Sequence, residues 1–156
     1  MPRPTKEQRV QEPPKVQGLK PVGVPARFLE RVYLTLGEYE AIRLADNDGL
    51  DHKEAAKAMG VSRPTFTRTI EKARKKVAEA IVGVKELVIE GGNYSFSTQM
   101  VRCMDCGEFQ RFDSLEELTK TCRNCGSSNI VHLNEWFTRR GHGECGGFRR
   151  GRGHLT

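Results

Sequence analysis

The chain has 156 residues, 37% of them hydrophobic and 29% charged, so it can form one average domain or two small ones but no single large core. Its formal net charge of +6 and pI near 9.2 favour an anionic partner such as nucleic acid. No apolar run approaches the ~18 residues of a membrane helix, and the start, MPRPTKEQRV, lacks the apolar stretch of a signal peptide. We therefore expect a cytoplasmic protein with no membrane partner.

The positive charge is concentrated in three segments. Basic residues outnumber acidic ones by six to three in residues 1–30, by eight to four in residues 51–82 and by five to one in residues 137–156. Six of the seven prolines lie within the first 25 residues, which favours an extended basic arm over residues 1–30. That arm either contacts nucleic acid or is a solvated tail.

Two helices are expected directly after the arm. Thr35 and Glu38 have the spacing of a capping box at a helix start. The apolar stripe of this first helix consists of Leu36, Tyr39, Ile42 and Leu44. The turn-forming residues DNDG at 46–49 end it. Asp51 and Glu54 form a second capping box, which predicts a short helix over residues 52–59.

A third, longer helix follows a tight turn. Gly60 is suited to end the preceding helix, because glycine enters the left-handed region cheaply. Ser62 is suited as the N-cap of the next helix, with Pro64 in its first turn. Apolar residues at helical spacing predict that this helix runs through Val82 with one face toward the core. The residues of that face are Phe66, Ile70, Ala73, Val77 and Ile81.

The second and third helices have the pattern of a helix-turn-helix. Ala56 is small enough for the next helix to pack over it, while Val61 and Phe66 are apolar and can fill the angle between the helices. In such a motif the start of the second helix enters the major groove of DNA. The candidate DNA-binding residues are Ser62, Arg63, Thr65, Thr67, Arg68, Lys72 and Lys75.

These side chains suit different contacts with DNA. Arg63 and Arg68 can donate two hydrogen bonds to a guanine edge, and the hydroxyl groups can reach phosphate or base. Lys72, Lys75 and Lys76 lie farther along the helix, where contacts to phosphate add affinity without sequence information. The alternative is an ordinary solvated helix face, on which charges of both signs would usually alternate.

Several motifs in order carry a resemblance to a known family: MPRP, KPVGVP, EAIRLAD, EAAKAMGVSRPTF, EKARKKVAEAI and IEGGNY. Over about residues 1–95 the chain resembles an uncharacterised bacterial and archaeal family of small predicted DNA-binding proteins. The helix-turn-helix of that family resembles region four of the main bacterial sigma factors, which reads promoter DNA. The resemblance implies a mainly α domain of three helices over residues 31–95, winged or like sigma region four, and a role in binding DNA. Nothing in the chain resembles the promoter-melting region of a complete sigma factor.

Two Cys-x2-Cys knuckles separated by fifteen residues predict a metal-binding module over residues 96–136. The knuckles are CMDCG at 103–107 and CRNCG at 122–126. Their four thiolates, Cys103, Cys106, Cys122 and Cys125, suit tetrahedral zinc, and iron in a rubredoxin-like site is the alternative to zinc. The module resembles a small β-rich zinc ribbon, with strands near residues 108–113 and 129–133. Two further short strands are expected around the turn at Gly91 and Gly92.

A site with four protein ligands leaves no open position for water, and the chain shows no nucleophile–base constellation, so we expect no enzymatic activity. His132 is expected at the surface, outside the metal site. The fifth cysteine, Cys145, lies in a Gly/Arg-rich tail over residues 137–156, where we expect disorder and a mobile thiol. That tail either binds nucleic acid or keeps the chain soluble.

The sequence therefore predicts a regulator of transcription that binds specific double-stranded DNA as a homodimer. The neighbourhood of the metal module is net acidic, with eight acidic and five basic residues in residues 83–136, which favours protein contact, dimerisation or contact with the transcription machinery. Two alternatives remain at this point. One is an RNA-binding protein that uses the ribbon and the tail, and the other is an iron electron carrier.

Overall fold

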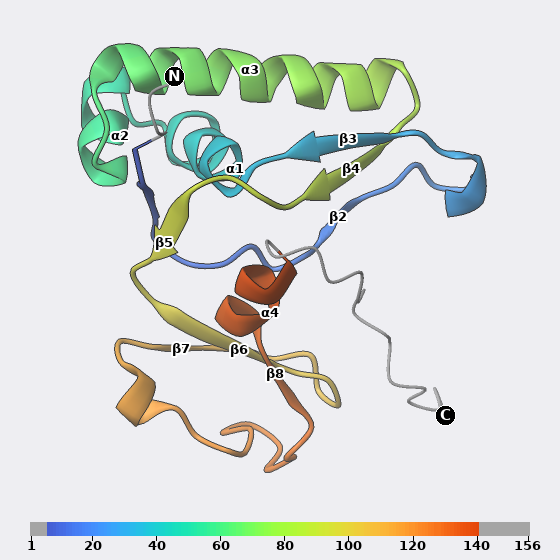
Figure 1. Ribbon diagram of the computed structural model, residues 1–156. Helices are drawn as coiled ribbons and strands as arrows, with labels where there is room; N and C mark the ends of the chain where they lie inside the picture. The colour runs from blue at the N-terminus through green and yellow to red at the C-terminus, as the bar shows by residue number, and fades with distance from the viewer. Residues whose placement is uncertain (1–5, 141–156) are drawn as a thin grey trace. The chain divides into compact units, whose positions relative to one another are not determined.

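The computed structural model of the chain describes residues 6–140, which form two compact units (Figure 1). The amino-terminal unit comprises residues 6–10 and 16–95, and the cysteine unit comprises residues 11–15 and 96–140. The backbone thus passes between the units three times. Helices and strands are both present, so the described fold is mixed α/β rather than mainly α.

In the amino-terminal unit, strands come both before and after the three helices along the chain. Its elements are β1 (Gln8–Val10), β2 (Gly18–Leu19), η1 (Ala26–Phe28), β3 (Arg31–Leu34), α1 (Leu36–Ile42), η2 (Arg43–Asn47), α2 (His52–Met59), α3 (Arg63–Val82), β4 (Glu86–Ile89) and β5 (Tyr94–Phe96). A three-stranded sheet has the order β2-β4-β3. β3 runs parallel to β4, with Val32 opposite Leu87, and β2 runs antiparallel to it. β1 and β5 form a separate two-stranded sheet.

The predicted helix boundaries are confirmed because local hydrogen bonds fix them. The Thr35 side chain accepts a hydrogen bond from the backbone N–H of Glu38 at 3.1 Å. Asp51 and Glu54 make both bonds of a capping box at the start of α2. Gly60 ends α2 with φ +67°, in the left-handed region where a side chain is disfavoured. The segment between α1 and α2 is a π-helical turn, η2, which the sequence did not predict.

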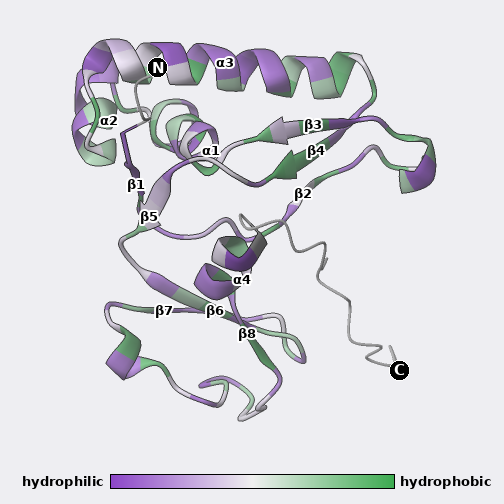
Figure 2. Cartoon of the chain, viewed as in Figure 1, coloured by the Kyte–Doolittle hydropathy of each residue, from purple (hydrophilic) through white to green (hydrophobic). Residues whose placement is uncertain are grey.

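The core of the amino-terminal unit lies where α1, α2 and α3 meet. Its fully enclosed residues include Ala41, Ala55, Met59, Phe66 and Ile70, and Val61 packs against them. Figure 2 shows the contrast between the hydrophobic strand β4 and the largely hydrophilic helix α3. The small residues of α2 therefore allow α3 to approach closely, as the sequence pattern predicts.

The prediction that Ile81 belongs to the core face of α3 is wrong. Ile81 is 73% exposed, and Ala80 is buried instead. At about 100° per residue, Ile81 is rotated about 60° from Phe66 whereas Ala80 is rotated about 40° in the other direction, so the apolar stripe drifts along a long helix. Ile81 is therefore at the surface, close to Leu19 of β2 and Leu87 of β4.

The amino-terminal segment is more than an arm. β1 pairs with β5, β2 pairs with β4, and Val10 is fully buried. Pro13 and Pro14 are also enclosed, within the part of the chain that belongs to the cysteine unit. The segment lacks regular helix, as its prolines predict, but it supplies strands to the fold, so the domain does not begin at residue 31.

The cysteine unit is a three-stranded sheet followed by a helix. Its elements are β6 (Gln99–Cys103), β7 (Phe109–Phe112), η3 (Leu115–Glu117), β8 (Ile130–His132) and α4 (Leu133–Arg140). β6 lies between β7 and β8 and pairs antiparallel with both. Asn134 fastens α4 to β6: its Oδ1 accepts from Met100 N at 2.9 Å and its Nδ2 donates to Thr98 O at 2.8 Å.

The predicted boundary at residue 137 falls inside α4. Phe137 is only 2% exposed and belongs to the core of the cysteine unit. His132 is half-buried rather than at the surface, with Nε2 3.1 Å from Gln99 Oε1. Cys145 and residues 141–156 of the predicted tail lie outside the described residues. No helix in residues 6–140 is long and apolar enough to cross a membrane.

Candidate functional sites

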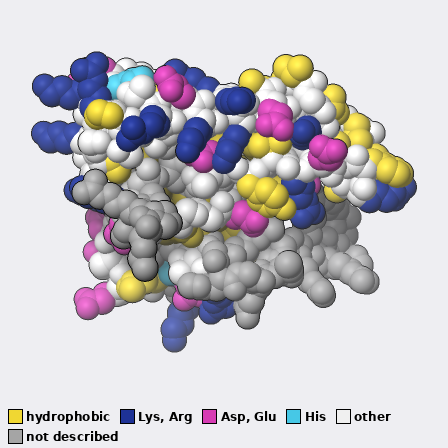
Figure 3. Space-filling model, turned by 45° about the horizontal axis from the view of Figure 1, so that its top comes forward, with side chains coloured by type: hydrophobic (Ala, Val, Ile, Leu, Met, Phe, Trp, Pro, Cys, Tyr) yellow, Lys and Arg dark blue, Asp and Glu magenta, His cyan; other side chains and the backbone are white. Residues whose placement is uncertain are grey.

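Four basic side chains of α3 make no salt bridge within the described residues: Arg63 lies at the start of the helix, and Arg68, Lys72 and Lys75 lie within about 60° of one another on the side opposite Phe66. All four are exposed. We call these four residues the basic face. Figure 3 shows Lys and Arg side chains along the helix side of the amino-terminal unit, with some Asp and Glu side chains among them. The face is positioned by the buried stripe of Phe66 and Ile70, which turns the opposite side of α3 to solvent.

Two neighbouring cations of α3 are paired and belong to the fold. Arg74 makes two hydrogen bonds to Asp46, the shorter at 2.7 Å, and Lys76 Nζ lies 2.9 Å from Glu38 Oε1. The hydrogen bond from Arg74 lowers the pKa of Asp46. Lys76, expected from the sequence to contact phosphate, is instead held against a buried carboxylate of α1. The structure thus divides the cations of α3 into free and paired groups.

The hydroxyl groups at the start of α3 are partly engaged within the chain. Ser62 Oγ accepts from Thr65 N at 3.3 Å and donates to Thr65 Oγ1 at 2.8 Å, which confirms Ser62 as the N-cap. Thr67 is half-buried, and its Oγ1 lies 2.9 Å from Nδ1 of His52 in α2. Ser62 is exposed and stays beside the basic face. Thr67 instead joins α2 to α3.

A further cation lies at the turn between α2 and α3. β1 places Arg9 over Gly60, so that a Cβ on Gly60 would lie 3.0 Å from Arg9 Nε. Arg9 is exposed. Sequence reasoning missed this residue, because more than 50 positions separate it from the turn and only the pairing of β1 with β5 brings it there. The excess of basic residues in the amino-terminal segment was the only signal for it.

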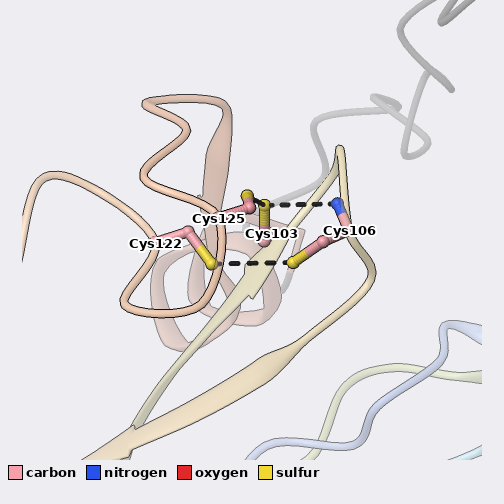
Figure 4. A group of neighbouring side chains, drawn as sticks. All are labelled: Cys103, Cys106, Cys122 and Cys125. Carbon is pink, nitrogen blue, oxygen red and sulfur yellow. Dashed lines mark hydrogen bonds between the residues drawn. The ribbon is translucent and has the colours of Figure 1, made fainter.

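The four predicted ligands meet in the cysteine unit (Figure 4). The Sγ atoms of Cys103, Cys106, Cys122 and Cys125 all lie within 4.8 Å of one another. Cys103 and Cys125 have their sulfurs 3.5 Å apart, and Cys106 and Cys122 have theirs 3.6 Å apart. A tetrahedron with metal–sulfur bonds of ~2.3 Å has edges of ~3.8 Å. The donor set and its spacing therefore fit a tetrahedral metal ion.

The two knuckles repeat one local geometry. The first cysteine of each knuckle accepts at its carbonyl from the following glycine: Gly107 N to Cys103 O is 3.0 Å, and Gly126 N to Cys122 O is 2.9 Å. Both glycines have positive φ, which a side chain would disfavour. Backbone N–H groups of Cys106 and Asn124 donate to the sulfurs of Cys103 and Cys122. The donor to Cys103 favours its thiolate over its thiol.

Two polar residues outside the ligand set hold the knuckles in place. Asp105, in the first knuckle, accepts hydrogen bonds from Ser127 Oγ and Asn129 Nδ2, which follow the second knuckle. The bond from Ser127 lowers the pKa of Asp105. Gln110 is buried, and its Nε2 donates to Cys122 Sγ at 3.2 Å. Neither role can be read from the spacing of the cysteines, because both depend on how the knuckles face each other.

Hydrogen bonds among the cysteines oppose the ionisation of all four thiols together. The N–H of Cys106 lowers the pKa of Cys103. The N–H of Ser127 acts to lower the pKa of Cys125. The hydrogen bonds with Cys103, Cys106 and Cys122, together with burial, outweigh this effect and raise the pKa of Cys125 to about 12. A divalent cation removes this conflict, since it stabilises all four thiolates at once. The cluster can therefore hold a metal ion, and binding would expel protons.

These features define a mixed α/β protein with a cluster of four cysteines that can bind a metal ion. The chain belongs to the family described as "Protein of unknown function DUF134", whose model matches residues 1–97. This confirms the family resemblance predicted from the motifs.

The similar proteins come from bacteria and archaea. A UPF0251 protein of Chloroherpeton thalassium is 51% identical over 143 residues, covering 92% of this chain and 94% of its own. One from Moorella thermoacetica is 44% identical over 131 residues, with coverages of 84% and 87%. One from Methanothermobacter thermautotrophicus is 41% identical over 155 residues, with coverages of 98% and 80%. No solved structure matches the chain.

Proposed function

We propose that the protein binds specific double-stranded DNA and regulates transcription, with α2 and α3 acting as a helix-turn-helix. The observation that carries the proposal is the basic face, whose four cations lack carboxylate partners in the described chain while Arg74 and Lys76 have them. An ordinary solvated helix would alternate its charges or satisfy them locally. On this side of α3 only Glu71 and Glu79 interrupt the exposed cations Arg68, Lys72 and Lys75, and such a surface, with Arg63 at the helix start, suits a regular polyanion.

The residues of this surface have separate roles in the proposal. Arg63 and Arg68, near the start of α3, would read base edges, and Ser62 and Thr65 would contact phosphate or base beside them. Lys72 and Lys75 would contact phosphate, and Arg9 would add a cation where the turn meets the backbone. Thr67 would hold α2 against α3, because its hydroxyl already meets His52. Such a module resembles region four of sigma factors in its use of a helix start.

The experiment begins by selecting preferred sites from fragmented genomic DNA and then measures binding by fluorescence anisotropy. The selected duplex is compared with a scrambled one at several salt concentrations. Arg68→Ala is expected to reduce the preference for the selected duplex at least about tenfold, the effect of losing one bidentate base contact. Lys120→Ala, which removes an exposed cation of the cysteine unit, is the matched control and should change neither affinity nor preference.

Two results would overturn the proposal. One is selection that enriches no sequence, with binding that does not respond to salt. The other is an Arg68→Ala chain that binds as selectively as the parent, since the reading of bases would then lie elsewhere.

We propose that the metal of the cysteine unit is zinc and that it holds the fold rather than doing chemistry. Four thiolates complete the tetrahedron, so zinc has no position for a reacting water, and the protein would bind nucleic acid without being an enzyme. The small core of this unit makes a folding role for metal reasonable. Elemental analysis tests the assignment: one zinc per chain supports it. One iron with strong visible absorption would support the electron-carrier alternative.

One observation favours a second candidate function, binding of single-stranded RNA by the cysteine unit. Phe109 on β7 is half-buried and has Lys15 Nζ 5.4 Å and Arg102 Cζ 5.3 Å from its ring centre. An aromatic ring with cations close to it can stack a base and attract phosphate. Tighter binding of single-stranded RNA than of the selected duplex, abolished by Phe109→Ala, would make this the main function.

A further inference from the structure

The amino-terminal unit carries a groove of about 380 Å³ at the carboxyl end of α3. We call it the apolar groove. Leu19 and Pro21 line one side, Val77, Ala80 and Ile81 of α3 line the other, and Leu87 of β4 contributes to its wall. Hydrophobic side chains gather at this end of the unit in Figure 3, while the basic face lies along the helix side. We propose that this groove is the interface through which two copies of the chain form a homodimer.

The first argument is the amount of apolar surface. Five side chains in and beside the groove are largely exposed: Leu19 65%, Val22 100%, Ile81 73%, Val82 82% and Val84 52%. A fully exposed aliphatic side chain offers ~100 Å² of apolar surface, so together they present roughly 370 Å². A standard dimer interface buries ~800 Å² on each partner, of which roughly 60%, or ~480 Å², is apolar. Leu19, Ile81 and Val84 line the groove and present about 190 Å² of this surface, and their sequence neighbours Val22 and Val82 extend it toward the area that such an interface requires.

The second argument is the backbone at Val84. Its φ is +53°, and it is the one described residue other than glycine with positive φ. A β-branched side chain is disfavoured in this region, where glycine or asparagine would cost less. The chain nevertheless places a half-exposed valine there, at the edge of the groove. A strained position that presents an apolar side chain to solvent is explained when a partner covers that side chain.

The third argument is the charge around the groove. Lys85 is bonded to Glu79 at 2.9 Å and to Glu30 at 3.3 Å, and Lys20 is exposed beside them. The rim thus carries two positive and two negative side chains, unlike the basic face. A two-fold axis brings the same surface from both copies together. A rim with both signs can then pair with itself, whereas an acidic or basic partner would meet repulsion.

Pairing through this end would space the basic faces. α3 has 20 residues and is about 30 Å long, and its exposed arginines lie near the end opposite the groove. Two copies joined at the groove would hold their arginines up to about 60 Å apart, within two turns of DNA at ~34 Å each. This spacing matters only if the proposed DNA binding holds, whereas the proposal of a dimer does not depend on DNA binding.

The test measures the mass of the full chain in solution without DNA, by sedimentation equilibrium over a range of concentrations. The parent chain is expected to be a dimer. Ile81→Asp should raise the dimer dissociation constant at least about tenfold, because it buries a carboxylate in the interface. Val84→Gly should weaken the dimer while relieving the positive φ, so the folded chain is kept. Leu115→Asp is the matched control, since Leu115 is an exposed apolar residue of the cysteine unit.

Circular dichroism of each variant shows whether it is folded. Folded, monomeric Ile81→Asp and Val84→Gly chains beside a dimeric Leu115→Asp chain would support the proposal. A parent chain that is monomeric at every concentration would overturn it. A folded Ile81→Asp chain that remains as dimeric as the parent would also overturn it. So would a Leu115→Asp chain that dissociates while the other two variants stay dimeric. Loss of DNA binding by a chain that stays dimeric would count against the proposed function and not against this interface.

Discussion

Lys75 and Lys76 are adjacent in the sequence, yet the structure predicts opposite effects for their removal. Lys75 lies on the basic face, whereas Lys76 Nζ is 2.9 Å from a carboxylate oxygen of Glu38, a residue only 7% exposed. Each phosphate contact changes the slope of log K against log salt by ~0.9. The three cations proposed to contact phosphate, Lys72, Lys75 and Arg9, would therefore give a slope of about −2.7 for each copy, and Lys75→Ala should reduce it to about −1.8. That variant should bind all duplexes more weakly and keep its stability.

Lys76→Ala should instead lower stability and leave the salt slope unchanged. It removes the cation that faces Glu38, whose Oε2 already lacks a hydrogen-bond partner. Leaving a buried charge unpaired costs about 1–2 kcal/mol here, since Lys76 itself is a third exposed. For a domain of this size that corresponds to a decrease in Tm of roughly 5–10 °C.

The assay pairs anisotropy at several salt concentrations with thermal unfolding followed by circular dichroism. Equal salt slopes for the two variants would refute the division of α3 into free and paired cations. A Lys75→Ala chain that is as destabilised as Lys76→Ala would refute it as well.

Three further predictions concern the cysteine unit and pH. Cys122→Ser should unfold the cysteine unit and leave the amino-terminal unit folded, as hydrogen exchange would show; loss of protection along the whole chain would contradict this. Zinc added to metal-free protein should release protons, because the pKa of Cys125 is about 12 without metal. Calorimetry in buffers of different ionisation enthalpy measures the number of protons released. A result of zero protons would be inconsistent with thiolate ligands. Asp46→Asn should cost less than about 1 kcal/mol at neutral pH, since the pair with Arg74 is exposed. The lowered pKa of Asp46 means that this stability is present above about pH 4 and disappears as pH falls through the folded pKa, so urea unfolding of the two chains should converge in strong acid.

The helices were predictable because their boundaries depend on neighbours a few residues apart. The caps at Thr35, Asp51 and Ser62 each bond to a residue three positions later, and the chain reverses at Gly60 by local geometry alone. The strands were harder. β4 and β5 were expected on either side of the Gly91–Gly92 turn, but they pair with different partners rather than with each other. β2 has two residues, too few for any periodic signal.

Sequence reasoning identified the cysteine ligands but not the residues around them. The spacing of the two knuckles was enough to predict that four sulfurs meet, because each knuckle presents two of them. Asp105 and Gln110 act across the site, so their roles follow only from the folded arrangement. The same applies to Lys75 and Lys76, which differ by about 100° around the helix. Which of them meets Glu38 depends on where α1 packs.

The pairing of β1 with β5 and of β2 with β4 also sets an order of events during translation. Strands made first wait for partners about 70 to 86 residues later in the chain, so at ~5–20 residues per second a ribosome needs roughly 4–17 s to deliver them. During that interval α1, α2 and α3 can form, but the sheets cannot close. The early strands are short and two prolines, at 13 and 14, lie between them, features that discourage pairing between nascent chains.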